Sequence, residues 1–201
     1  MLQSRRTYDD MLFNRDKIIL DLCGGTGVWS KPYKDAGYDV RLITSPDYDV
    51  TDHIPPENVY GILAAPPCTM FSIARQTAAT PRDFIKGMIP VNACIRIAWT
   101  SKPKFFALEN PSFGKLIHWL GKPAYVFHPW HFGDPRTKST GLWGYFNHPV
   151  KLFHNITDVM TDEEIELAKR NSLPWPGHGS YKVRRSITPA GFAKAFYEAN
   201  K

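Results

Sequence analysis

Short apolar runs, each closed by glycine, proline or a polar turn, recur along the first 150 residues of the chain. Runs that end at such a breaker are typical of buried strands in a parallel sheet. Residues 62–65 (ILAA) show the pattern most clearly, because Pro66 and Pro67 follow at once and proline cannot continue a sheet ladder. We expect strands at residues 17–21, 38–44, 62–65, 104–108, 125–128 and 141–146.

Helical segments are expected between and after these strands. Residues 1–16 are polar and are expected to form a peripheral arm or a short helix. Alternation of strands and helices predicts one α/β domain over residues 1–201, with a mostly parallel sheet and helices on both faces. The predicted helices are residues 28–36, 83–88, 91–100, 114–121, 161–171 and 189–199, with a break at Pro90.

Chemically useful residues follow three of the strands at their carboxyl ends, where open α/β sheets bind ligands. A glycine turn, GGTG (24–27), follows the first strand, and Cys68 follows the third. Glu109 and Asn110 follow the fourth strand and precede Pro111. A cysteine in such a chain is more often buried and inert than reactive. An acid and a glycine turn at the same edge of the sheet make Cys68 a candidate nucleophile.

The order and position of these motifs resemble the DNA (cytosine-5) methyltransferases. The motifs that carry the resemblance are DLCGGTG (21–27), PPCTMFS (66–72) and ENP (109–111), with weaker matches at FGDPRTK (132–138) and RRSITPAGFAKAF (184–196). The resemblance implies a Rossmann-like methyltransferase fold that binds S-adenosylmethionine and transfers a methyl group to carbon 5 of cytosine in DNA.

The resemblance also implies a set of catalytic residues. Cys68 would add as a thiolate to carbon 6 of cytosine, which makes carbon 5 nucleophilic enough to accept the methyl group. Because only the thiolate attacks, its pKa must be lowered or a base supplied nearby. Glu109 would contact ring nitrogen 3, and Arg136 and Lys138 would contact a substrate phosphate or the ring oxygen.

Binding residues follow from the same motifs. Contacts to the cofactor S-adenosylmethionine are expected from Asp21, Leu22, Gly24, Gly25, Gly27, Asp52 and Pro66. Contacts to the substrate are expected from Pro67, Ser72, Asn110, Arg184 and Arg185. No metal is expected, because the three cysteines are widely spaced and give no zinc signature.

Two departures from the family pattern change the expectation. Thr44 and Ser45 stand where the family carries an acid that holds the cofactor ribose, so either Asp47 or Asp49 replaces it or ribose binding is weakened. Residues 147–183 form a short insertion in place of a full target-recognition domain, which leaves little surface for reading bases in the major groove. We therefore expect low or very short sequence specificity, as in a compact phage-type enzyme, or help from a partner protein.

Composition adds little that is specific. The net charge is +6, and part of the positive charge falls near Arg136 and Arg184, which favours phosphate contact. Widely spaced cysteines fit a reducing compartment, and no apolar run is long enough to span a membrane, so we expect a cytoplasmic monomer of a prokaryote or phage-infected cell. Two alternatives stay open: the same chemistry on a free pyrimidine nucleotide or RNA, and a non-catalytic nucleic-acid-binding module.

Overall fold

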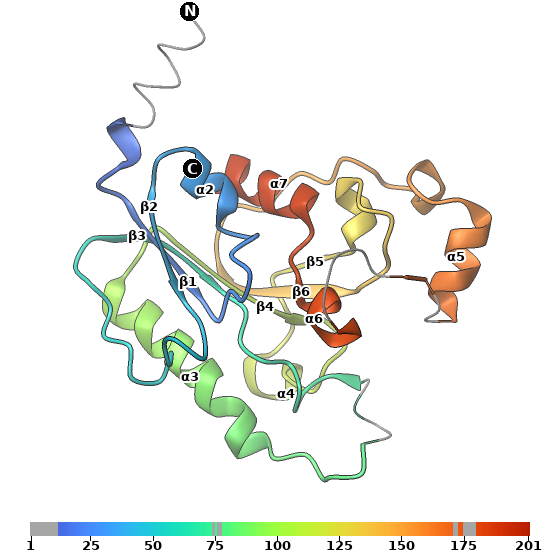
Figure 1. Cartoon of the computed structure of the whole chain (residues 1–201), viewed down its shortest axis with the longest axis horizontal. Coiled ribbons are helices and arrows are strands. Elements are labelled where there is room, and N and C mark those ends of the chain that lie inside the picture. Colours follow the sequence, from blue (N-terminus) through green and yellow to red (C-terminus); the bar gives the residue numbers. More distant parts are fainter. Residues whose placement is uncertain (1–11, 74, 76–77, 171–172, 175–179) are drawn as a thin grey trace, which may run out of the picture.

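A six-stranded sheet forms the centre of the chain in the computed structural model, which describes residues 12–73, 75, 78–170, 173–174 and 180–201. Its strand order is β2-β1-β3-β4-β6-β5 (Figure 1). The first four strands in this order are parallel neighbours, and β6 runs antiparallel to both β4 and β5. The strands are β1 (Ile18–Leu22), β2 (Asp39–Ile43), β3 (Val59–Ala64), β4 (Phe105–Pro111), β5 (Tyr125–Phe127) and β6 (Thr140–Tyr145).

Helices cover both faces of this sheet, which confirms the predicted α/β architecture with a mostly parallel sheet. One long helix lies on one face, and two helices lie on the other (Figure 1). The helices and short 3-10 turns are α2 (Lys31–Asp35), α3 (Phe84–Ser101), α4 (Ile117–Leu120), η2 (Pro129–Phe132), η3 (Ile156–Asp158), α5 (Asp162–Lys169), α6 (Tyr181–Ser186) and α7 (Ala190–Asn200). The expected arm at residues 1–16 lies largely outside the described residues.

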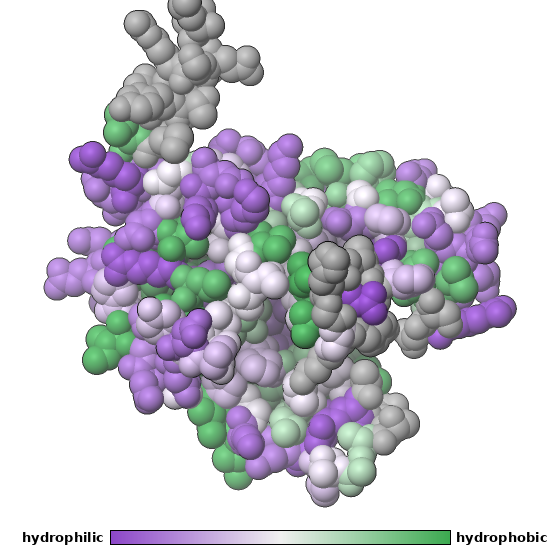
Figure 2. All heavy atoms as spheres, viewed as in Figure 1, coloured by the Kyte–Doolittle hydropathy of each residue, from purple (hydrophilic) through white to green (hydrophobic). Residues whose placement is uncertain are grey.

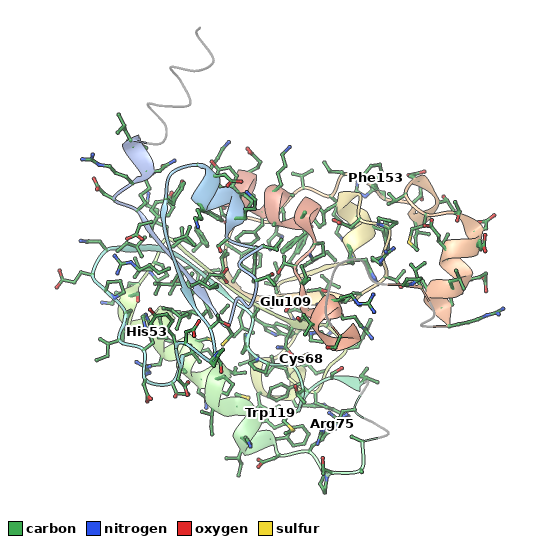
Figure 3. The ribbon with its side chains drawn as sticks, in the orientation of Figure 1. His53, Cys68, Arg75, Glu109, Trp119 and Phe153 are labelled. Atoms are coloured by element: carbon green, nitrogen blue, oxygen red, sulfur yellow. The ribbon has the colours of Figure 1, made fainter. Side chains whose placement is uncertain are left out.

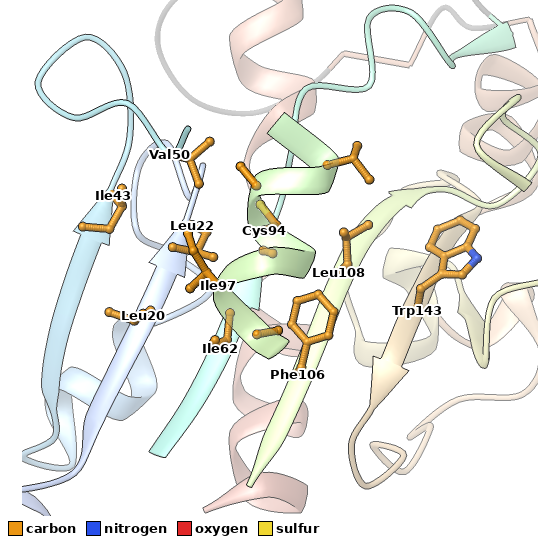
Figure 4. Packing of buried hydrophobic residues seen from close by; sticks show 14 of the residues in the cluster. Leu20, Leu22, Ile43, Val50, Ile62, Cys94, Ile97, Phe106, Leu108 and Trp143 are labelled. Carbon is orange, nitrogen blue, oxygen red and sulfur yellow. The ribbon is translucent and has the colours of Figure 1, made fainter. Parts of the chain in front are cut away.

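The buried strands supply side chains to two separate cores, because successive residues of a strand point to opposite faces. Leu20 and Leu22 of β1 pack with Cys94 and Ile97 of α3, as Figure 4 shows. Ile19 faces the other side, where α2 and α7 bury an aromatic cluster. In that cluster the ring of Trp29 lies 5.4 Å from Phe196 and 5.7 Å from Phe192.

The helix α3 is continuous, so the predicted break at Pro90 is wrong. Asp83 caps the helix by accepting a hydrogen bond from the Lys86 amide at 2.9 Å, and the helix then passes through Pro90 to Ser101. Proline inside a helix removes one backbone hydrogen bond and costs about 3 kcal/mol. Burial of the α3 face that includes Val91 and Ile97 against the sheet offsets this cost.

Several other expected boundaries also differ. Strand β3 begins at Val59, before the expected 62, and α4 covers only Ile117–Leu120 of the expected 114–121. Strand β4 extends through Glu109 to Pro111, because β6 pairs alongside and sets Glu109 opposite Leu142. The helix after the glycine turn begins only at Lys31, three residues after the expected start at 28, and spans five residues. Residues 23–30 instead form turns, with Pro32 in the first helical turn.

The carboxyl-terminal third wraps around the edge of the sheet that carries β5. Backbone amides of Leu152 and Phe153 donate to the His131 carbonyl at 2.9 and 3.1 Å, which fastens the insertion at 147–183 to η2. Helix α5 projects at one end of the molecule and is largely hydrophilic (Figures 1 and 2). Helix α7 returns to pack against α2 and η2. Among the described helices, none is both long and apolar enough to cross a membrane.

The aromatic core makes a direct prediction about stability. Phe196 is fully buried against Trp29, Phe105 and Phe192, so Phe196→Ala should lower the free energy of unfolding by about 3–5 kcal/mol. Ile85→Ala, at a position 84% exposed on α3, should change it by less than about 0.5 kcal/mol. Urea denaturation of both variants measures the difference, and equal midpoints would contradict the packing described.

Candidate active site

The loop that carries Cys68 is held on both sides by neighbouring strand ends. The Ala65 amide donates to the Leu22 carbonyl of β1 at 2.9 Å. On the other side the Asn110 side-chain amide donates to the Pro66 carbonyl at 3.0 Å. The Asn110 side chain is completely buried, so this bond connects β3 to β4 inside the protein. The segment that leads from β3 into Cys68 is therefore hydrogen-bonded to the ends of β1 and β4.

A tight turn and an arginine shape the chain beyond Cys68. The amides of Phe71 and Ser72 donate to the Cys68 carbonyl at 2.9 and 2.8 Å. The two terminal nitrogens of Arg82 donate to the carbonyls of Met70 and Ser72 at 2.8 and 3.0 Å. Sequence reasoning missed Arg82, because its partners are backbone atoms and leave no side-chain motif.

Phe71 of this turn packs in an aromatic cluster with Trp119 and Phe84. Phe71 is fully buried, and its ring lies 5.8 Å from Trp119 and 6.3 Å from Phe84. Its carbonyl accepts from the Lys115 amide at 2.8 Å. Gly87 of α3 packs closely on this turn, because a Cβ there would lie 2.8 Å from the Met70 Cβ and 3.1 Å from the Phe71 ring. Trp119 lies near the Cys68 loop in Figure 3.

Glu109, Lys138 and Arg185 surround the Cys68 thiol with charge. The Lys138 ammonium lies 3.2 Å from a Glu109 carboxylate oxygen, and both side chains are more than four-fifths buried. Cys68 and Glu109 lie close together in Figure 3. Burial raises the pKa of the Cys68 thiol, the negative charge of Glu109 raises it further, and the positive charges of Lys138 and Arg185 oppose both effects.

Of the two expected routes to a thiolate, a lowered pKa or a nearby base, the protein alone does not provide the first. The pKa of Cys68 lies above its ordinary value because burial and Glu109 outweigh the two cations. The fraction of Cys68 present as thiolate thus depends on the charge of Glu109. Any ligand that protonates or neutralises Glu109 removes one cause of the raised pKa and favours the reactive form.

The carboxyl-terminal basic segment reaches this site through α6. Ser180 begins the helix by accepting a hydrogen bond from the Val183 amide at 3.3 Å. The helix places Arg185 close enough to Cys68 for its charge to lower the thiol pKa. Arg184 lies on the same helix and is half-buried. The expectation that Arg184 and Arg185 contact the substrate stays a prediction.

Arg136 and Lys138 lie in the same turn but have different surroundings. Arg136 lies beside Asp134, whose pKa is raised by burial and lowered by the Gly191 amide and the Arg136 charge. Asp134 accepts from that amide at 3.2 Å, which fixes the turn to α7. Lys138 faces Glu109 instead. Of the two predicted catalytic cations, Lys138 is the one that the structure brings to the acid.

The glycine turn and the Cys68 loop leave the adjoining parallel strands β1 and β3 at the same edge of the sheet. Asp21 is fully buried beneath the turn and accepts from the Ser30 hydroxyl at 2.5 Å. A Cβ at Gly24 would lie 2.1 Å from Asp21 Oδ1, so only glycine permits this packing. Gly25 and Gly27 have φ of 57° and 70°, and a Cβ at Gly25 would meet nothing within 4 Å. The turn therefore exposes backbone that a ligand can approach.

Some predicted cofactor residues lie under this surface. The side chains of Asp21 and Leu22 are fully buried, and the Leu22 carbonyl already accepts from Ala65. Pro66 is also buried, whereas Pro67 beside it is exposed. Asp21, Leu22 and Pro66 consequently shape the turn and the loop from within. The exposed backbone around Gly25 fits a cofactor that approaches closely, as the sequence predicts.

The loop after β2 keeps its three carboxylates, Asp47, Asp49 and Asp52, exposed to solvent. Thr44 stands at the family's acid position, and its hydroxyl accepts from the Gly25 amide at 3.3 Å. Asp49 caps a turn by accepting from the Thr51 amide at 2.9 Å, and this bond lowers its pKa. Asp52 is exposed on the same loop. Arg96 of α3 holds two carbonyls of this loop at 3.0 and 3.1 Å.

A separate surface groove lies away from these charges. It has a volume of about 430 Å³ and runs between α2 and α7, with Pro32, Ala193 and Tyr197 among its lining residues. None of the predicted site residues lines it. Within the described residues, no group of three or more histidine, cysteine or acidic side chains could hold a metal ion.

A scan against models of protein families and a search among curated proteins find no match to this chain. The chemistry of the site is therefore inferred from its own residues. A thiol, an acid paired with a lysine, and an open glycine turn share one edge of the sheet. This arrangement suits nucleophilic addition to a polar ring while a second ligand lies on the glycine turn.

The charge balance around Cys68 can be tested by its reactivity. Glu109→Gln should lower the pKa of Cys68 and speed its alkylation at pH 8, because a negative charge disappears. Lys138→Met should raise the pKa and slow alkylation. Peptide-level mass spectrometry of iodoacetamide labelling across a pH series measures both. Lys169→Met, which removes a lysine paired with Glu166 on α5, is the control and should leave the profile unchanged.

Asp21 predicts a pH dependence of folding. Burial raises its pKa from 3.8 to about 6, so the folded protein holds this proton more tightly than the unfolded chain. Its stabilising contribution is present below pH 3.8 and is lost as the pH rises through about 6. Relative to Asp21→Asn, the natural protein should lose up to about 1.4 kcal/mol per pH unit in that window. Parallel stability curves in urea would contradict the prediction.

Proposed function

We propose that this chain transfers a methyl group from S-adenosylmethionine to carbon 5 of cytosine in DNA through a covalent Cys68 adduct. The observation that supports the proposal most directly is the grouping of Cys68 with Glu109 and Lys138 beside the open glycine turn. The resemblance of the three sequence motifs supplies the reaction, and the grouping of their residues at one edge of the sheet fits its chemical requirements.

Cys68 is the nucleophile in this proposal. Its thiolate adds to carbon 6 of the cytosine ring, and the electron pair of the 5,6 double bond becomes available at carbon 5. The backbone turn at Phe71 and Ser72 and the bond from Asn110 to Pro66 hold the attacking sulfur in place. Loss of the carbon 5 proton after methyl transfer restores the double bond and releases Cys68.

Glu109 and Lys138 limit the negative charge that builds up on the cytosine ring during the addition. A proton shared between Glu109 and ring nitrogen 3 prevents negative charge from accumulating on the ring. The same proton neutralises Glu109, which removes its unfavourable effect on the Cys68 thiolate. Substrate binding and nucleophile activation are coupled in this way. Lys138 orients the carboxylate at 3.2 Å, and Arg185 adds positive charge near the thiolate.

The glycine turn would hold the cofactor next to this site. Bound S-adenosylmethionine supplies an electrophilic methyl group. The backbone of Gly25 and Gly27 would face it, and Asp52 could accept from its adenine amine. The Ala65–Leu22 bond sets the glycine turn beside the Cys68 loop, as a transfer between the two ligands requires.

DNA is the proposed acceptor, with a short recognition context. A target base must leave the helical stack to reach a strand-end site. Arg184 and Arg185 on α6 can contact the phosphates near that base. The insertion at 147–183 contributes η3 and the eight-residue α5 to its described part. A small insertion also suits RNA or a free pyrimidine nucleotide, so the acceptor is the point to test.

Covalent trapping tests the chemistry. An oligonucleotide with 5-fluorocytosine cannot lose a proton from carbon 5, so the Cys68 adduct should persist in a denaturing gel when cofactor is present. Cys68→Ser should abolish the band, Cys94→Ala should retain it, and Glu109→Gln should slow its formation by about 10²-fold or more. Absence of any adduct would leave the binding-module alternative.

Labelled methyl transfer in the same samples identifies the acceptor. Duplex DNA, single-stranded DNA, RNA and dCMP are offered separately, and duplex or single-stranded DNA should be labelled. Labelling of RNA or dCMP instead would move the same chemistry to the alternative substrate.

A further inference from the structure

Arg82 binds the Cys68 turn (residues 68–72) at two backbone positions. One terminal nitrogen of its guanidinium donates to the Met70 carbonyl at 2.8 Å, and the other donates to the Ser72 carbonyl at 3.0 Å. The Ser72 amide in turn donates to the Cys68 carbonyl at 2.8 Å and closes the turn. The guanidinium therefore spans the segment whose first residue is the proposed nucleophile.

The start of α3 fixes the position of Arg82 itself. Asp83, the next residue, caps the helix by accepting a backbone hydrogen bond at 2.9 Å. Gly87, in the first turn of the helix, is buried, and a Cβ there would lie 2.8 Å from the Met70 Cβ. The Cys68 turn thus contacts the start of α3 in two ways, through the guanidinium and through the packing of Met70 on Gly87.

We propose that Arg82 is a positioning residue for Cys68, holding the Cys68 turn against α3 so that the thiol keeps one orientation toward the substrate. Rates of nucleophilic addition depend steeply on such placement, and an error of about 1 Å can cost roughly 10²-fold. The effect on rate rests on the proposed function. The hold on the turn does not, because it follows from the two hydrogen bonds alone.

Arg82 acts through geometry in this proposal and not through its charge. The charges that shift the pKa of Cys68 come from Glu109, Lys138 and Arg185. The two terminal nitrogens of Arg82 are instead bonded to carbonyls of the turn. A lysine does not reproduce this contact, because it offers one ammonium in place of two donors in a rigid plane. Removal of Arg82 should therefore disturb the orientation of the thiol without raising its pKa.

The first experiment measures the order of the turn in the full chain. Arg82→Met removes both donors and keeps a long apolar side chain. Deuterium exchange read by mass spectrometry should become about tenfold faster in the peptide that contains Phe71 and Ser72, whose amides donate to the Cys68 carbonyl. Exchange in peptides from α7 should stay unchanged, which shows an intact fold. Equal exchange of the turn in both proteins would overturn the proposal.

Two further variants make this comparison specific. Arg41→Met removes a partly exposed arginine that pairs with Asp39 on the edge strand β2, and it should exchange as the natural protein does. Arg82→Lys keeps the charge, and its exchange should lie between those of the natural protein and Arg82→Met. If Arg82→Met does not fold, Arg82→Lys takes its place. Natural exchange in Arg82→Lys would overturn the hold at two carbonyls.

The second experiment separates positioning from binding. Adduct formation on the 5-fluorocytosine oligonucleotide is followed over a range of oligonucleotide concentrations. Arg82→Met should lower the rate at saturation about 10²-fold and leave the half-saturating concentration within about twofold. Arg41→Met should change neither quantity. A raised half-saturating concentration with an unchanged rate at saturation would indicate a contact to the nucleic acid and overturn the proposal.

The pH dependence of iodoacetamide alkylation at Cys68 gives a third readout. Its midpoint should not rise in Arg82→Met, in contrast to the rise expected for Lys138→Met. A higher midpoint, as loss of a nearby positive charge produces, would assign Arg82 an electrostatic role and overturn the proposal. If the natural protein forms no adduct, the proposed function fails, and the exchange measurement still decides whether Arg82 orders the turn.

Discussion

The hydrogen bond from the Asn110 amide to the Pro66 carbonyl is the constraint on which the candidate site depends. It lies inside the protein, where an unpaired polar group costs about 1–3 kcal/mol, so the two loops are strongly held together. With the Ala65–Leu22 bond, it joins the ends of β1, β3 and β4. The glycine turn, Cys68 and Glu109 consequently form one rigid edge.

The protonation of Cys68 at this edge of the sheet depends on opposing effects of burial and nearby charges. Burial and Glu109 keep the Cys68 thiol protonated, while Lys138 and Arg185 favour the thiolate. Neutralisation of Glu109 shifts this balance toward the thiolate. The largely buried Glu109–Lys138 pair fixes the position of the negative charge that opposes the thiolate.

The two hydrophobic cores support different parts of the candidate site. Helix α3 packs beneath β1, β3 and β4 and supplies Gly87, whose missing side chain leaves room for Phe71 and the Cys68 turn. The aromatic core on the other face anchors α7, and the chain just before α7 forms α6 with Arg185. Continuous packing of α3 across Pro90 fixes both the Cys94 region and the support of Phe71.

The order of the six strands along the chain, the glycine turn and the position of Cys68 just after a strand follow from local sequence, because runs of apolar residues closed by breakers specify burial directly. Contacts between distant segments settled the rest. Pairing with β6 drew Glu109 into β4 and brought Lys138, and not Arg136, to its carboxylate. Likewise, Arg82 holds the turn after Cys68 through two backbone carbonyls, and the charge of Arg185 on α6 acts on the Cys68 thiol. These contacts depend on strand register and helix placement, which are properties of the whole packed chain.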